Sequence, residues 1–131
     1  MKKFLSIFVL LIVLFLTTRA HAKTLTFSQA YGQIDHKPMA ILVYADWADN
    51  YQNHLINFRK TERTTLGQYF NFVELDIASK EAKLFNDKFE IYPQLPYIIL
   101  LRNNGKVTHY IKRNCSSDTS CIISKMKSFL I

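Results

Sequence analysis

Six consecutive apolar or aromatic residues at positions 39–44 form the segment that most restricts what this chain can fold into. Pro38 stands immediately before them, and the apolar pattern ends at residues 45–47, Ala-Asp-Trp. A short apolar run with such boundaries is typical of a buried β-strand that ends in a turn. From Asp49 onward the apolar residues are spaced as in a helix, without glycine or proline. The sequence therefore predicts a strand, a tight turn and a helix that is capped by Asp49 or Asn50 and ends near Thr65.

Two later segments continue the alternation of strand and helix. Residues 71–77 carry a short apolar run that Asp76 closes, which indicates a second strand. Ser79 is placed to cap a helix that runs to Lys88 with apolar residues on one face. Residues 97–102 are again continuously apolar up to a final arginine, so we expect a third buried strand there.

The two ends of the chain are less regular. Residues 24–27 alternate as a strand does, and Ser28 is placed to cap a short helix that ends before Pro38. Residues 103–105, Asn-Asn-Gly, are typical of a two-residue hairpin turn that leads into a strand over 106–112. A closing helix is expected from Ser117 or Thr119 onward. Its predicted core face consists of apolar residues: Ile122, Ile123, Met126, Phe129 and Leu130.

The stretch that starts at Lys37-Pro38 and ends at Trp47 resembles the start of a thioredoxin domain. It is most similar to the carboxy-terminal periplasmic domain of the bacterial transmembrane thiol:disulfide interchange protein. In that family the tryptophan is followed at once by Cys-x-x-Cys, and those two positions are Ala48 and Tyr51 in this sequence. The family also has a buried carboxylate five residues before the tryptophan, where this chain has Leu42.

A second part of the resemblance lies at Leu95-Pro96. In thioredoxin-like proteins an apolar residue and a cis-proline stand just before a central strand, and here a strand is predicted to start at Tyr97. The resemblance covers residues 24–131. It implies an α/β thioredoxin fold, with a mixed central sheet and helices on both faces.

The replaced residues remove the groups that perform disulfide exchange. The reaction needs a thiolate at a helix amino terminus and a second thiol that releases the partner. Neither Ala48 nor Tyr51 supplies a thiol, and Leu42 supplies no proton acceptor. We therefore expect no Cys-x-x-Cys oxidoreductase activity at this site, and hence a non-catalytic module.

Aromatic residues remain where the family has its substrate groove. The resemblance implies that Trp47, Tyr51 and Tyr97, together with Tyr92, lie around the cis-proline. It also implies that the backbone of Leu95 is offered to an extended peptide. Exposed aromatics beside free backbone groups suit the binding of a protein or peptide partner by strand addition. The alternative, equally open, is that these aromatics are partly buried and bind nothing.

The only cysteines are Cys115 and Cys121. An even count in an exported chain favours a structural disulfide, which would tie the end of the last strand to the first turn of the last helix. The alternative is a relocated redox pair, since Cys121 stands near a helix start that could lower the pKa of its thiol.

The first 22 residues have the features of a secretory signal peptide. Two lysines precede an apolar run, and residues 20–22, Ala-His-Ala, suit cleavage after Ala22. The expected mature domain is therefore 23–131, periplasmic or secreted, with no membrane anchor after cleavage. Its net charge is +4, from +7 less the three basic residues of the signal.

Other chemistry has little support in the sequence. The basic residues are scattered, which argues against nucleic acid as a partner. The densest group, around Arg59 and Lys60, is interpreted as a solvated helix face. His36, His54 and His109 are isolated, so no metal site is expected, and no cofactor motif is present.

Overall fold

The computed structural model describes residues 25–131, so the predicted signal peptide lies outside the described residues. The elements follow one another in this order: α2 (Phe27–Tyr31), β1 (Met39–Tyr44), α3 (Tyr51–Glu62), α4 (Leu66–Tyr69), β2 (Asn71–Asp76), α5 (Lys80–Lys88), β3 (Tyr97–Arg102), β4 (Val107–Ile111), α6 (Arg113–Ser116) and α7 (Thr119–Leu130). In the described part of the chain, no helix is long and apolar enough to cross a bilayer.

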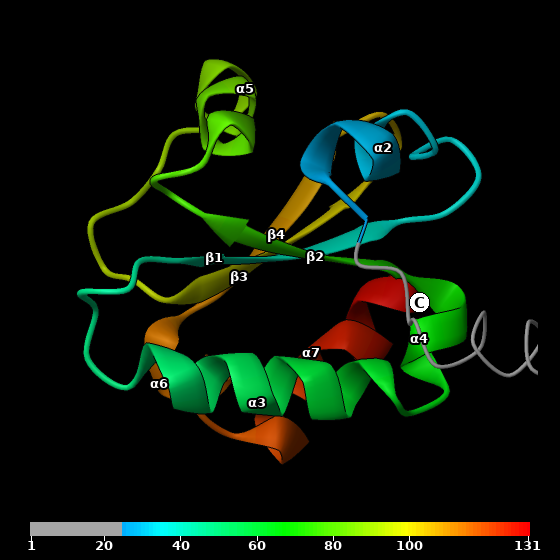
Figure 1. Ribbon diagram of the computed structural model, residues 1–131. Helices are drawn as coiled ribbons and strands as arrows, with labels where there is room; N and C mark the ends of the chain where they lie inside the picture. The colour runs from blue at the N-terminus through cyan, green and yellow to red at the C-terminus, as the bar shows by residue number, and fades with distance from the viewer. Residues whose placement is uncertain (1–24) are drawn as a thin grey trace, which may run out of the picture.

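The four strands form one mixed sheet in the order β2-β1-β3-β4. β1 runs parallel to β2 and antiparallel to β3, and β4 pairs antiparallel with β3. Figure 1 shows the sheet nearly edge-on, with α2 and α5 on one side of it and α3 and α7 on the other. The predicted α/β class, with a mixed sheet covered on both faces, is confirmed.

The residues of β1 alternate between the two cores. Met39, Ile41 and Val43 pack in the cluster that contains Phe27 and Phe85, on the side of α2 and α5. Ala40 and Leu42 pack in the other cluster, against α3 and α7. Because the strand is buried on both faces, its sequence is continuously apolar rather than alternating.

The prediction of a strand at residues 24–27 is wrong for residues 25–27, which the structure describes. Thr26 is the N-cap of α2, and its side chain and that of Gln29 form a capping box. Phe27 already belongs to the helix. Ser28 is not the N-cap, because it lies within α2. Its backbone N–H and its hydroxyl both donate to the Glu81 carboxylate of α5.

The helix predicted to reach Thr65 ends at Glu62, and a separate short helix, α4, follows it. Asn50 stands at the N-cap of α3 in the left-handed conformation, with φ 59°, and its side chain makes no capping hydrogen bond. Arg59 pairs with Glu74 of β2 through two hydrogen bonds of 2.8 Å, rather than with a neighbour on its own helix.

The carboxy-terminal part also differs in detail from the prediction. The hairpin loop spans residues 103–106, because Arg102 pairs with Val107, so it has four residues instead of two. An unpredicted short helix, α6, follows β4 and contains Cys115. α7 begins at Thr119 as expected, but Leu130 is exposed rather than part of the core.

Candidate functional site

Several loops meet at one end of the sheet. Figure 1 shows the loop after β1, the start of α3, the segment before β3 and α6 gathered at the left of the view. A groove of about 730 Å³ opens between them, which we call the polar groove. Five of its eleven lining side chains are amides, contributed by α3 and its cap, by the segment before β3 and by α6: Asn50, Asn53, Asn57, Gln94 and Asn114.

Three cationic side chains also line the polar groove. Lys60 comes from α3, and Lys112 and Arg113 follow β4; all three residues are exposed. The lining contains no aspartate or glutamate. Within residues 25–131 the only salt bridge joins Arg59 to Glu74, so these three cations have no carboxylate partner among the described residues. The groove is therefore a positively charged surface.

A second, more apolar cavity of about 420 Å³ adjoins the polar groove, and we call it the tyrosine pocket. The rings of Tyr92, Tyr97 and Tyr110 line it, and their centroids lie 5.1 to 5.9 Å apart. Burial raises the pKa of Tyr97, and it is the main cause that raises the pKa of Tyr110 to about 12. The hydroxyls of these two tyrosines are therefore protonated at neutral pH.

The predicted residues at the start of α3 differ in exposure. Trp47 is 68% exposed, whereas Ala48 is buried. Tyr51 is half-buried, and its ring stacks on that of Tyr44, with the centroids 5.9 Å apart and the planes at 3°. Of the aromatics expected around the cis-proline, Trp47 and Tyr92 are open to solvent, while Tyr97 is buried.

The peptide bond between Leu95 and Pro96 is cis, as the resemblance implied. Both residues are buried. The backbone N–H of Leu95 donates to the carbonyl oxygen of Pro93 at 3.0 Å. The N–H group of Leu95 therefore has an internal partner, and the expectation that this backbone is offered to a peptide stays a prediction.

Leu42 has no exposed surface, and it packs in the same cluster as Phe58 of α3 and Ile98 of β3. The position beneath α3 is thus filled by hydrocarbon. A carboxylate at this position would lie in an apolar environment, which is costly without a partner.

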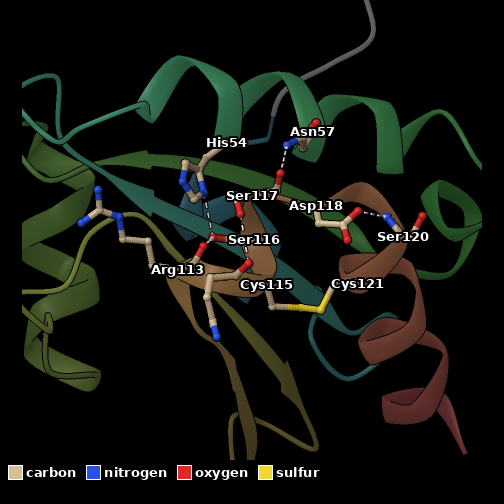
Figure 2. Close-up of a disulfide and its surroundings, with 10 residues drawn as sticks. His54, Asn57, Arg113, Cys115, Ser116, Ser117, Asp118, Ser120 and Cys121 are labelled. Carbon is tan, nitrogen blue, oxygen red and sulfur yellow. Dashed lines mark hydrogen bonds between the residues drawn. A yellow bond between two sulfur atoms is a disulfide. The ribbon is translucent and has the colours of Figure 1, made fainter.

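Cys115 and Cys121 form the predicted disulfide, with their Cα atoms 5.4 Å apart. The bond connects α6 to the first turn of α7, rather than the end of a strand to that helix. Figure 2 shows the bridge, with His54 and Asn57 of α3 facing the residues between the two cysteines. The disulfide therefore closes a loop that lies against α3.

A set of polar contacts, of which the His54–Ser116 contact is buried and the Asn57–Ser117 contact is exposed, ties this loop to α3. Nδ1 of His54 lies 2.8 Å from the Ser116 hydroxyl oxygen, and the hydroxyl donates to the Arg113 carbonyl oxygen at 3.3 Å. The Asn57 amide donates to the Ser117 carbonyl oxygen at 2.8 Å (Figure 2). Burial and the nearby Arg113 guanidinium lower the pKa of His54. This histidine, interpreted as isolated from its sequence, is a buried hydrogen-bonded residue at the wall of the polar groove.

Several residues of this region were not predicted from the sequence: Gln94, Tyr110, Lys112, Arg113 and Ser116. They come from separate segments that meet only in the fold. The one local signal was the adjacent pair Lys112-Arg113 just before the first cysteine. In the part of the chain that the structure describes, no three His, Cys, Asp or Glu side chains are grouped to hold a metal ion.

Comparison with known proteins gives the class of fold. No protein-family model and no curated protein matches the chain. Among solved structures, mitochondrial thioredoxin 3 from Saccharomyces cerevisiae is 17% identical with a TM-score of 0.61, over 81% of this chain and 93% of that one. Thioredoxin f from spinach chloroplast is 15% identical with a TM-score of 0.60, over 80% and 86%. Thioredoxin from Malassezia sympodialis is 18% identical with a TM-score of 0.60, over 79% and 84%.

These structures are thioredoxins, and the chain shares their fold over most of its length. The chain therefore has the thioredoxin fold that its sequence predicted.

Proposed function

We propose that this chain is an exported thioredoxin-fold protein that binds a protein or peptide partner in the cell envelope and performs no disulfide exchange at the start of α3. The resemblance at 37–47 to the periplasmic domain of the thiol:disulfide interchange protein supports the envelope as its location. The absence of both cysteines from that motif distinguishes it from the enzymes.

The observation that carries this proposal is the position of the sulfur atoms. The chain has two cysteines, and they are bonded to each other between α6 and α7. The start of α3 has a methyl group at Ala48 and a phenol at Tyr51, neither of which can form a mixed disulfide. With Leu42 beneath α3, the thiols and the carboxylate are missing together.

The surface that remains is suited to binding. Trp47 is 68% exposed in the turn before α3, three residues before Asn50, which lines the polar groove. Tryptophan and tyrosine are enriched among residues that dominate protein interfaces. A large indole exposed at this position has no evident role in packing, which favours a contact with a partner.

In-cell photo-crosslinking tests the proposal. A benzoylphenylalanine introduced at Trp47 or at Gln94 is expected to yield the same discrete adduct. The same group at Leu84, which is 48% exposed on α5, is the matched control and should not yield that adduct. Identical background adducts at all three positions would overturn the proposal.

A second candidate function is thiol-disulfide exchange by the Cys115–Cys121 pair. It is favoured by one observation, that Cys121 lies partly exposed in the first turn of α7, where the helix dipole stabilises a thiolate. The reduced Cys121 would attack a partner disulfide. Cys115 would then displace the partner as a dithiol and restore the internal bond. Insulin reduction that is lost in the C115S/C121S variant would support this function.

A further inference from the structure

We infer that the polar groove and the tyrosine pocket together form one binding surface for an acidic protein segment that carries a large aromatic side chain. This inference rests on the proposed binding function and specifies the chemistry of the partner.

The two cavities share part of their lining. Gln94, Lys112 and Arg113 line both of them. A segment that crosses these three side chains would therefore reach the amide-lined part on one side and the tyrosines on the other.

Charge complementarity defines one half of the partner. Lys60, Lys112 and Arg113 are exposed, and the lining of neither cavity contains an acidic residue. Each ion pair at such an exposed rim adds little affinity, so the larger effect is on partner selection and association rate. Carboxylates are the groups that these cations would select.

The tyrosine pocket defines the other half. Its exposed wall is mostly hydrocarbon, and the ring of Tyr92 is 42% exposed at its mouth. The rings of Tyr92 and Tyr110 meet edge to face at 73°. Both rings line the cavity of about 420 Å³. A phenyl or indole ring would bury apolar area there, and its pairing with the tyrosine rings would stabilise it further.

The amide side chains of the groove suit a polypeptide backbone between those two anchors. Each carries both donors and an acceptor, as a peptide unit does. Asn50 and Asn53 at the start of α3 lie on one wall, and Gln94 lies on another. These side chains can form hydrogen bonds with the main chain of the bound segment, whereas the N–H of Leu95 already has an internal partner.

A nucleic acid fits this surface less well than a peptide. Single strands bind on successive exposed ring faces along a basic track. Here the three tyrosines pack against one another, and Tyr97 is buried, so they present one pocket instead of a row of stacking faces. We therefore assign the surface to a protein segment.

Selection from a random peptide library displayed on phage tests the inference, with the full chain as the immobilised target. Bound peptides are expected to be enriched in aspartate and glutamate beside a phenylalanine, tyrosine or tryptophan. The K112E/R113E variant should weaken binding of a selected peptide at least about tenfold, which corresponds to ~1.4 kcal/mol. The K80E/K83E variant makes the same charge change on exposed residues of α5 and should retain binding within about twofold at the same salt.

A second pair of variants tests the pocket. Tyr92→Ala should abolish the preference for an aromatic residue over alanine in a selected peptide. Tyr69→Ala, at a tyrosine on α4 that is 56% exposed, should leave that preference intact. Thermal melts of each variant would establish that it is folded.

The outcomes separate this inference from the proposed function. If Trp47 crosslinks a specific partner but the library shows no acidic or aromatic enrichment, the binding function stands and this inference is overturned. An equal loss of affinity in K80E/K83E and K112E/R113E, or the absence of any selected peptide, would also overturn it. A failure of the Trp47 crosslink alone would count only against the proposed function.

Discussion

The ring nitrogen Nδ1 of His54 and the hydroxyl oxygen of Ser116 lie 2.8 Å apart in the interior, and they join α3 to the loop that the disulfide closes. Because both residues are buried, neither group can replace this partner with water at no cost. The contact therefore holds the α6 side of the polar groove against its α3 side.

The first prediction is that His54 makes the stability of the protein depend on pH. The pKa of His54 lies below its ordinary value of 6.5 in the folded state, so the unfolded chain binds more protons around that pH. The stability that the neutral ring contributes is present above pH 6.5 and is lost as the pH falls toward the folded pKa. His54→Gln should lower the free energy of unfolding at neutral pH and should reduce the loss of stability on acidification. Urea denaturation at a series of pH values would measure both effects, and parallel pH curves would contradict the assignment.

The second prediction concerns the disulfide. Replacing Cys115 and Cys121 by serine should lower the free energy of unfolding by roughly 2–3 kcal/mol, since the bond restricts a short loop of the unfolded chain. The loop also carries Ser116, which contacts His54 at the wall of the polar groove. The affinity of the polar groove for a selected peptide should therefore fall as well. Denaturation of the oxidised protein with and without a reductant provides the control. A variant as stable as the oxidised protein would show that the bond constrains nothing.

The third prediction compares two glycines. A Cβ atom at Gly67 would meet the backbone carbonyl oxygen of Glu62, where α3 turns into α4. Gly67→Ala should therefore destabilise the fold by at least about 1–3 kcal/mol, because backbone has to move. At Gly32 a Cβ atom would approach the carbonyl oxygens of Gln29 and Ser28 no closer than 3.5 Å, so Gly32→Ala is the matched control with little effect. Thermal melting of the two variants distinguishes them.

The fourth prediction concerns Leu42. Its side chain is fully buried between β1 and α3, so Leu42→Ala should cost about 2–5 kcal/mol through lost burial and the cavity that remains. Leu42→Met conserves volume and should cost less than about 1.5 kcal/mol. Chemical denaturation gives both values. Equal effects of the two substitutions would mean that the position is not tightly packed.

The fifth prediction concerns the left-handed residue before α3. Asn50 has φ 59°, a conformation that costs an ordinary residue roughly 1–2 kcal/mol. Asn50→Ala should lower the free energy of unfolding by about 1 kcal/mol, whereas Asn50→Gly should be neutral or slightly stabilising at this φ. The difference between the two melting curves is the measurement, and no difference would show that the turn relaxes.

The two central strands, β1 and β3, were predictable because burial on both faces leaves a continuous apolar run, at 39–44 and at 97–102. The edge strand β2 carries a shorter apolar run that Asp76 closes, and this run also became a strand. α6 was missed because its four residues are polar and begin directly after β4. At the amino-terminal end, the capping box of Thr26 and Gln29 outweighed a weak alternation that suggested a strand.

The candidate site was predictable only in part. Trp47 and the cis-proline at Pro96 were found because they belong to local motifs of a known fold. The cations were missed because Lys60 and Arg113 are far apart in the sequence and meet only when α3 and α6 pack together. Arg59 and Lys60 were grouped as one solvated face, but Arg59 pairs with Glu74 and Lys60 lines the polar groove.

The hydrogen bond from the Leu95 N–H to the Pro93 carbonyl oxygen affects the sequence selectivity of the proposed binding surface. A free main-chain N–H donates to the carbonyl oxygens that every polypeptide has, and so this contact is indifferent to sequence. With that donor turned inward, recognition would fall to the asparagines, lysines and tyrosines of the surrounding loops, which distinguish one side chain from another. A thioredoxin fold in which this N–H has an internal partner would therefore bind a narrower range of polypeptides.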